Sequence, residues 1–241
     1  MVSSQYLIDV TYNAGDVPSD DYPFNLAALQ NFKRLKFHPK VTYFIGENGS
    51  GKSTLLEAFA VALGFNPEGG TKNFNFETFE TEYPLSRYLR LGRGYPYPRD
   101  GFFLRAESFF NVATQVDELD LQGWYGGKSL HEQSHGESFL TLMTTRFHGD
   151  AIYILDEPEA ALSPQRQLAV LSRIHDLVRD SSQFIIATHS PILMAYPDST
   201  IYQCGPDGIT EVDYEDTEHY QVARDFLSNR ERMLKILLAD D

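Results

Sequence analysis

Residues 46–54 form the segment with the clearest chemical character, a glycine-rich run that reads GENGSGKST. It has the form G-x-x-x-x-G-K-[ST], in which glycines let the backbone curl so that successive N–H groups face phosphate oxygens. Lys52 is expected to reach the β and γ phosphates of a nucleotide, and the Ser53 hydroxyl is expected to ligate Mg²⁺. The expected contacts to the nucleotide are Gly46, Glu47, Asn48, Gly49, Ser50, Gly51, Lys52, Ser53 and Thr54.

Two acidic residues, Asp156 and Glu157, follow the apolar run AIYIL at residues 151–155. A carboxylate at the end of a buried strand can lie beside the metal that a phosphate loop binds, so Asp156 is expected to hold Mg²⁺. Glu157 is then placed to polarise the attacking water. The structural alternative is an ordinary strand followed by an acidic turn that Pro158 ends.

His189 ends a third apolar run, FIIATHSP. The carboxyl ends of parallel strands lie at one edge of a sheet, so His189 is expected beside the phosphate loop and Asp156. In that setting it is a candidate contact to the γ phosphate. Taken alone, the histidine is more often a packed or capping residue, and nothing at helical spacing suggests a metal ligand.

The elements that must position these residues alternate between strands and helices. The runs 40–45, 151–155 and 183–188 predict buried strands, and residues 52–65 predict a helix with Leu55, Leu56, Phe59 and Leu63 on one face. Ser163 predicts the start of another helix, whose apolar stripe comprises Leu168, Leu171, Ile174 and Leu177. We expect an α/β fold with a largely parallel sheet flanked by helices, in one domain spanning residues 1–241. A helical, aromatic insertion at about 66–138 and a tail of one strand and two helices complete it.

Residues 131–138, HEQSHGES, are open to two interpretations. Ser134 and Glu137 have the form of a capping box, S-x-x-E, ahead of an apolar run, so the segment can simply start a helix. A helix N-terminus that carries serine and glycine is also a site for an anion. In a monomer the phosphate loop already accounts for the nucleotide, which leaves this second anion site without a ligand.

The order GENGSGKST, QSHGES, LDEPEAALSP, ATHSP resembles the ATP-binding cassette (ABC) ATPases, and more narrowly the SMC/RecF/OLD-like soluble branch, as a stand-alone AAA-family ATPase. The resemblance covers about residues 37–191. It implies a P-loop NTPase fold with ATP and Mg²⁺ bound. It also implies that Ser134 and Gly136 contact the γ phosphate held by a second subunit, so that a head-to-tail homodimer encloses two ATP molecules.

Two residues of the family pattern and the length of one segment need separate comment. The family has a glutamine after the strand that precedes the helical insertion, and Glu107 takes that place here as an expected metal contact, with Gln115 as second choice. For the aromatic side chain that stacks on adenine, Phe37 and Phe32 are the candidates. The segment between Lys52 and Ser134 is too short for the coiled coil of SMC proteins, which predicts a head without arms.

Composition limits the range of partners. The net charge of −14 disfavours indiscriminate adhesion to nucleic acid or anionic lipid. Five arginines nevertheless lie within residues 87–105, interleaved with aromatic residues. We call them the arginine cluster; they are Arg87, Arg90, Arg93, Arg99 and Arg105. They could contact DNA together with Tyr88, Tyr95, Tyr97, Phe102 and Phe103, and one of the arginines could serve the phosphates. Otherwise they belong to an ordinary surface insertion or pair with the acidic C-terminal region.

Together these features predict an ATPase, with Lys52, Glu157 and His189 as catalytic residues, whose hydrolysis cycle opens and closes a dimer. Such a switch would act on DNA in repair or maintenance, or in phage defence, with DNA or a protein effector as partner. The alternatives are the nucleotide-binding subunit of an ABC membrane transporter and a regulatory ATPase of an effector nuclease. No run is long enough to cross a bilayer, the start lacks a secretory signal, and Cys204 is the sole cysteine. A cytoplasmic protein without membrane insertion is therefore expected.

Overall fold

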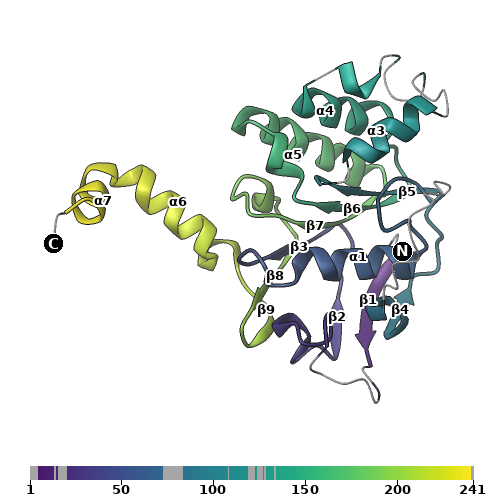
Figure 1. Ribbon diagram of the computed structural model, residues 1–241, viewed down its shortest axis with the longest axis horizontal. Helices are drawn as coiled ribbons and strands as arrows, with labels where there is room; N and C mark the ends of the chain where they lie inside the picture. The colour runs from purple at the N-terminus through teal and green to yellow at the C-terminus, as the bar shows by residue number, and fades with distance from the viewer. Residues whose placement is uncertain are drawn as a thin grey trace.

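The computed structural model describes residues 5–13, 15, 21–72, 84–107, 109–118, 123, 127, 129–132 and 134–239. Within them, helices cover both faces of a six-stranded sheet, and a smaller three-stranded sheet lies beyond one of the helices (Figure 1). The expected α/β class with a mostly parallel sheet is therefore confirmed.

The six-stranded sheet contains the three predicted strands that lead to the phosphate loop, to Asp156 and to His189. Its order is β5-β6-β7-β3-β8-β9, with the first five strands parallel and β9 antiparallel to β8. The central strands β3, β6 and β7 are buried along their whole length, as apolar runs covered on both faces should be. The strands are β3 (Val41–Ile45), β5 (Asp100–Arg105), β6 (Ala151–Asp156), β7 (Gln183–Ala187), β8 (Thr200–Gly205) and β9 (Gly208–Glu211).

The second sheet was not predicted. It has the order β2-β1-β4 and is antiparallel throughout, with β1 (Leu7–Tyr12), β2 (Arg34–Lys36) and β4 (Leu89–Arg93). The buried Gln183 side chain connects the two sheets. Its Oε1 accepts hydrogen bonds from the backbone N–H groups of Tyr6 and Leu7, and its Nε2 donates to the Leu7 and His38 carbonyls.

The large sheet divides the core into two apolar clusters, one on each of its faces. Helix α1 (Lys52–Leu63) lies between the two sheets, and its four predicted core residues are buried. Three helices cover the opposite face: α3 (Phe109–Glu118), α4 (His135–Thr145) and α5 (Pro164–Arg179). The shorter elements are α2 (Pro84–Arg87) and the 3₁₀ turns Ala27–Leu29, Leu130–Glu132, Pro158–Ala161, Leu193–Ala195 and Tyr214–Asp216.

The predicted stripe of α5 was wrong at one position. Leu168 is 57% exposed, and the buried residues are Val170, Ile174 and Leu177. These three lie at i, i+4 and i+7 and so share one face of a helix, whereas Leu168 is rotated away from it. Ser163 caps the helix as expected, since its side chain accepts a hydrogen bond from the Arg166 N–H.

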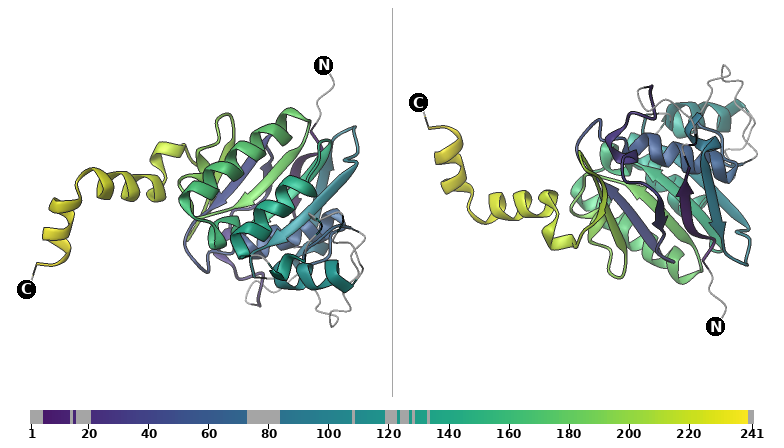
Figure 2. Two further views of the ribbon diagram at one scale, coloured as in Figure 1. Left: turned by 90° about the horizontal axis from the view of Figure 1, so that it is seen from above. Right: turned by 90° about the horizontal axis from the view of Figure 1, so that it is seen from below.

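The C-terminal region follows the predicted pattern of one strand, β9, and two helices. These helices are α6 (Glu218–Ser228) and α7 (Arg230–Leu237), and neither contains a buried residue. Both extend away from the rest of the chain (Figures 1 and 2). Among the described residues, the search for a helix of membrane-spanning length and hydrophobicity finds none.

Candidate functional site

The phosphate loop (residues 46–54) joins the end of β3 to the start of α1. Gly46 has φ +139°, and a Cβ there would lie 2.3 Å from the Cys204 carbonyl oxygen, so the position requires glycine. Gly51 is the N-cap of α1 with φ +96°, a conformation that glycine adopts without steric cost. The sequence therefore folds into a loop that ends at a helix N-terminus, which is where backbone N–H groups can receive an anion.

Lys52 lies inside this loop rather than in solvent. Its residue is 3% exposed, and its Nζ donates to the Gly46 and Glu47 carbonyls at 2.9 and 2.8 Å. Burial lowers the pKa of its ammonium group, an effect that the Glu157 carboxylate opposes. The buried Ser50 hydroxyl has no hydrogen-bond partner among the described residues. The Lys52 ammonium group and the unpaired Ser50 hydroxyl can both donate hydrogen bonds to phosphate oxygens.

Ser53 and Asp156 meet, although 102 residues lie between them. The Ser53 Oγ donates to Asp156 Oδ1 at 3.0 Å, because β6 ends beside the first turn of α1. Burial raises the pKa of Asp156 to about 6, against the lowering effect of nearby Arg105. A hydroxyl and a carboxylate are hard oxygen ligands that suit Mg²⁺ when phosphates complete its shell. The described residues contain no cluster of three His, Cys, Asp or Glu that would bind a metal unaided.

Glu157 has a left-handed backbone conformation, φ +52° and ψ +51°, which is unfavourable for a residue other than glycine. Its N–H donates to the Ala187 carbonyl at 2.9 Å, so β7 holds the strained residue in place. The Glu157 side chain, 39% exposed, lines a cavity of about 350 Å³ with Lys52, Ser53 and Glu107. Non-glycine residues in such conformations concentrate at functional sites.

His189 comes within reach of Glu157, as the position of the two strand ends predicted. Its Nε2 lies 3.5 Å from Glu157 Oε1, and its backbone N–H donates to Glu159 Oε1 at 2.5 Å. Its other ring nitrogen, Nδ1, lies 3.2 Å from Nε2 of His219. Burial is the main cause that lowers the pKa of His189, and Lys52 adds to it.

Glu107 lies two residues beyond the end of β5, at the strand-end position expected of it. Its side chain is 89% exposed and lines the same cavity as Ser53 and Glu157. Gln115, the second choice, lies within α3 and not at a strand end. The candidates for adenine stacking were wrong, because Phe32 and Phe37 are each 4% exposed and pack against Phe59 in the core.

Ser134 and Gly136 are not brought to the phosphate loop of their own chain. Ser134 is the N-cap of α4 and forms the capping box, in which its N–H and hydroxyl both donate to Glu137 Oε2. Arg166, from α5, lies 3.3 Å from Glu137 and 3.5 Å from the Ser134 hydroxyl. The cavities that border the phosphate loop include neither Ser134 nor Gly136 in their linings. The capping interpretation therefore holds within one chain, and an anion site would need a ligand from elsewhere.

The arginine cluster separates into different environments. Arg105 is turned inward, with Nη1 2.6 Å from Glu57 Oε2 and Nε 3.8 Å from Asp156 Oδ2. Phe102 and Phe103 are fully buried, so the expectation that they contact DNA was wrong. Among the described ion pairs, cluster members pair with Glu57, Glu107, Asp150 and Asp156, and none pairs with the acidic C-terminal region. That region projects from the opposite side of the molecule (Figure 1).

Two contributors near the reactive residues were not identified from sequence. His219 touches His189 from α6, and no spacing links two histidines on separate elements. The role of Arg105 depends on the pairing of β5 with β6, which places Arg105 opposite Asp156. The sequence left open that one cluster arginine serves the phosphates, without indicating which one.

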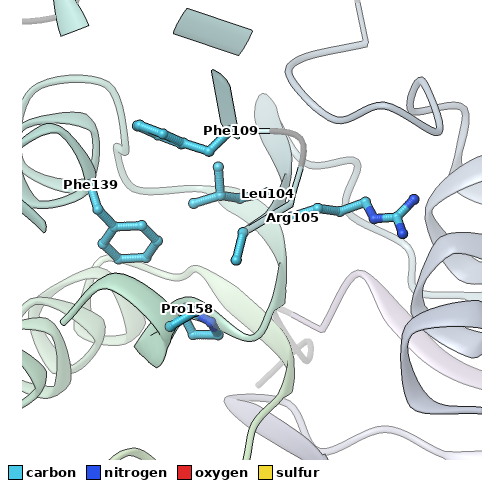
Figure 3. Close-up of a pocket in the computed structure, with 7 residues that line it drawn as sticks. Leu104, Arg105, Phe109, Phe139 and Pro158 are labelled. Carbon is cyan, nitrogen blue, oxygen red and sulfur yellow. The ribbon is translucent and has the colours of Figure 1, made fainter. Parts of the chain in front are cut away.

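An apolar cavity of about 370 Å³ lies behind the end of β5, near but separate from the phosphate loop. Leu104, Phe109, Phe139 and Pro158 line it, while the Arg105 guanidinium points away from it (Figure 3).

Comparison with known proteins adds two family matches. Residues 24–99 match the model of an AAA domain, and residues 129–195 match a model described as AAA domain, putative AbiEii toxin, Type IV TA system. The first match includes the phosphate loop. The second includes Ser134, Asp156, Glu157 and His189.

Individual relatives are similar over limited lengths. The chain is 41% identical over 68 residues to the DNA double-strand break repair Rad50 ATPase of Methanocaldococcus jannaschii, covering 26% of this chain and 6% of that protein. It is 24% identical over 171 residues to ABC transporter G family member STR2 of Medicago truncatula, covering 63% of this chain and 24% of that protein. The chain thus spans less than a quarter of the length of either relative.

Among solved structures, cbiO1 from Clostridium perfringens, part of the ABC transporter complex cbiONQ, has a similar fold. The match covers 95% of this chain and 97% of that chain at 16% identity, with a TM-score of 0.50. At this identity the match shows the fold and no more.

Proposed function

We propose that this chain, an ABC-type ATPase of the SMC/Rad50 branch, binds Mg·ATP at its phosphate loop and hydrolyses it in a homodimer. The observation that carries the proposal is the meeting of residues from three strand ends. Ser53 lies 3.0 Å from Asp156, and Glu157 lies 3.5 Å from His189, all beside Lys52. Phosphoryl transfer to water needs a phosphate cradle, a metal-binding pair and a water-activating base, and each has a candidate here.

The residues divide this work by chemical type. Lys52 and the N–H groups of the phosphate loop would hold the β and γ phosphates. When phosphate binds, the Lys52 ammonium group would exchange its hydrogen bonds to the Gly46 and Glu47 carbonyls for hydrogen bonds to phosphate oxygens. Ser53 and Asp156 would hold Mg²⁺, with Glu107 at the border of the same cavity. When bound, Mg²⁺ supplies charge neutralisation for the phosphate oxygens.

Glu157 would act as the general base. Its carboxylate faces the cavity beside Lys52 and can accept a proton from the attacking water. His189 would donate a hydrogen bond to a γ-phosphate oxygen through Nε2. The strained backbone of Glu157, which the Ala187 carbonyl holds, fixes where the carboxylate points.

Ser134 and Gly136 would complete the site of a second copy. They lie at the N-terminus of α4, where the partial positive charge of the helix favours an anion, and no phosphate loop of their own chain reaches them. Two copies in head-to-tail arrangement would each offer this helix end to the ATP held by the other. ATP would close such a dimer and hydrolysis would open it, because the bound phosphate is what both halves contact.

We place the switch in DNA repair or maintenance, or in phage defence. This placement is supported by the match to a Rad50 ATPase and by the exposed Arg87, Arg90 and Arg93, which could contact DNA phosphates. A transporter subunit is the second candidate, which the STR2 match favours. A regulatory ATPase for an effector nuclease would use the same chemistry and differ only in its protein partner.

The ATPase part is tested by phosphate release and ATP binding in single variants. Glu157→Gln should lower kcat by about 100-fold or more while ATP still binds, because only the base is removed. Lys52→Ala should abolish binding itself. Glu211→Gln, the same change at an exposed residue of β9, should behave as wild type. A Glu157→Gln variant that hydrolyses ATP at the wild-type rate would contradict the proposal.

A further inference from the structure

We infer that His219 is a positioning residue for His189: it donates a hydrogen bond from Nε2 to Nδ1 of His189 and thereby keeps the proton of His189 on Nε2, facing the nucleotide site. The inference deepens the proposed function and rests on it, because it concerns the contact of His189 with a γ phosphate. It also makes helix α6 part of the catalytic site.

The two imidazoles come from different parts of the fold. His189 follows strand β7, and His219 is the second residue of α6. Their facing nitrogens are 3.2 Å apart, with ring centroids separated by 5.4 Å. The first turn of α6 is fixed in place by Thr217, which is fully buried. Its hydroxyl donates to the Tyr214 carbonyl at 2.7 Å and accepts from the Tyr220 N–H. The position of His219 is therefore set by the fold.

Two facing ring nitrogens form a hydrogen bond only if one carries a hydrogen and the other a lone pair. Burial lowers the pKa of both imidazoles, so both are mainly neutral near pH 7. Either His189 donates from Nδ1, which leaves its Nε2 as a lone pair, or His219 donates from Nε2, which puts the hydrogen of His189 on Nε2. The surroundings of the outer nitrogens distinguish these arrangements.

The outer nitrogen of His189 faces an acceptor. Nε2 lies 3.5 Å from Glu157 Oε1 and makes no hydrogen bond within the described residues. The nearby carboxylate nevertheless attracts a hydrogen on Nε2, whereas it would repel a lone pair there. The remaining charged groups around the pair are Lys52, Glu159 and Glu218. Lys52 and Glu159 do not change this preference, because Lys52 is directed to the loop carbonyls and Glu159 Oε1 accepts from the His189 backbone.

The outer nitrogen of His219 has no such neighbouring carboxylate oxygen among its hydrogen-bond partners in the described part of the chain. Its Nδ1 is buried and has no hydrogen-bond partner among the described residues. In either arrangement one outer nitrogen is a donor without a hydrogen bond to the described residues, at His189 Nε2 if His219 donates and at His219 Nδ1 if His189 donates. Among the described ion pairs, only at His189 Nε2 does that hydrogen lie near a carboxylate, 3.5 Å from Glu157 Oε1, so the pair favours donation from His219 to His189.

As a consequence, His189 presents an N–H donor at Nε2 that can bond to a phosphate oxygen. Phosphate oxygens only accept, so His189 contacts them usefully only with its hydrogen on Nε2. The cavity beside His189, about 750 Å³, is lined by Glu47 and Asn48 of the phosphate loop and by Val222 and Phe226 of α6. A displacement of α6 would therefore remove the group that orients His189.

The test uses the full chain with two variants of similar shape, His219→Gln and His219→Met. Glutamine can donate from its amide, and methionine cannot. His219→Met should lower kcat about 10- to 100-fold with little change in KM for ATP, as loss of an orienting partner does. His219→Gln should restore kcat to within about threefold of wild type. Equal losses in both variants would overturn the inference, because only the Gln side chain can replace the donated hydrogen.

Nitrogen-15 NMR of the histidine rings separates this inference from the proposed function. In the wild type without nucleotide, His189 should carry its hydrogen on Nε2, and in His219→Met it should show a mixture of tautomers. A wild-type His189 with its hydrogen on Nδ1 would overturn the inference whether or not ATP is hydrolysed. A wild type that hydrolyses no ATP but has the expected tautomer would overturn the proposed function while upholding the His219–His189 contact.

Discussion

At the scale of single residues, the reactive groups acquire their properties from burial. Asp156 is 6% exposed, and removal from water destabilises its charged form, which is why its pKa rises to about 6. Arg105 and the Ser53 hydroxyl offset part of this effect. The residue is therefore held in a state that the protein alone satisfies poorly and that a divalent cation would satisfy well.

Asp156→Asn should stabilise the nucleotide-free protein at pH 7 to 8. The carboxyl of the folded protein keeps its proton up to about pH 6, whereas in the unfolded chain it ionises near its usual value of 3.8. The folded state therefore loses stability as the pH rises between these values, by about 3 kcal/mol in all. The variant should gain up to that amount at pH 7 to 8, and its advantage should vanish near pH 4.

Thermal denaturation across this pH range measures the difference. Asp216→Asn, at an exposed position, is the matched control and should change stability little. If Asp156→Asn is less stable than wild type at pH 8, burial is not what governs this carboxyl.

At the scale of elements, the fold depends on contacts that join its two sheets. Gln183 satisfies two backbone N–H groups and a carbonyl near the start of β1 from its position on β7. No strand hydrogen bonds connect the sheets, because β1 pairs only with β2 and β4 among the described strands. Side-chain hydrogen bonds, among them those of Gln183, therefore join the two sheets in place of strand pairing.

Gln183→Leu should lower the free energy of unfolding by about 3 kcal/mol, because it leaves buried backbone groups of Tyr6 and Leu7 without partners. For a chain of this length that loss corresponds to a fall in Tm of about 6 to 12 °C. Calorimetry of the variant tests this, with Gln221→Leu on the exposed face of α6 as control. A fall no larger than that of the control would show that the amide does not join the sheets.

The predictability of the elements follows from their patterns. Strands β3, β6 and β7 were predicted because uninterrupted apolar runs are typical of strands buried on both faces. The β2-β1-β4 sheet was missed, because β2 has only three residues and β4 contains two arginines and a glycine. Asp156, Glu157 and His189 could be predicted to meet because parallel strands end at one edge. Arg105 and His219 could not, since strand register and the path of the tail decide their positions.

At the scale of the whole molecule, the residues of the proposed dimer site lie in two separate regions of the chain. The phosphate loop, Asp156, Glu157 and His189 lie together, while Ser134 and Gly136 lie apart at the end of α4. A head-to-tail pair of copies would bring each half to its complement. We propose that this pairing depends on ATP.

Light scattering of the Glu157→Gln protein, with and without Mg·ATP, measures this dependence. We expect a molar mass near 27.4 kDa without nucleotide and twice that value with it, since ATP is bound and not hydrolysed. Ser134→Arg in the same background should remain a monomer with ATP bound, whereas Ser134→Asn, which keeps a helix-capping side chain, separates loss of the cap from obstruction of the site. A mass that does not respond to ATP, in a protein shown to bind it, would rule out an ATP-dependent dimer.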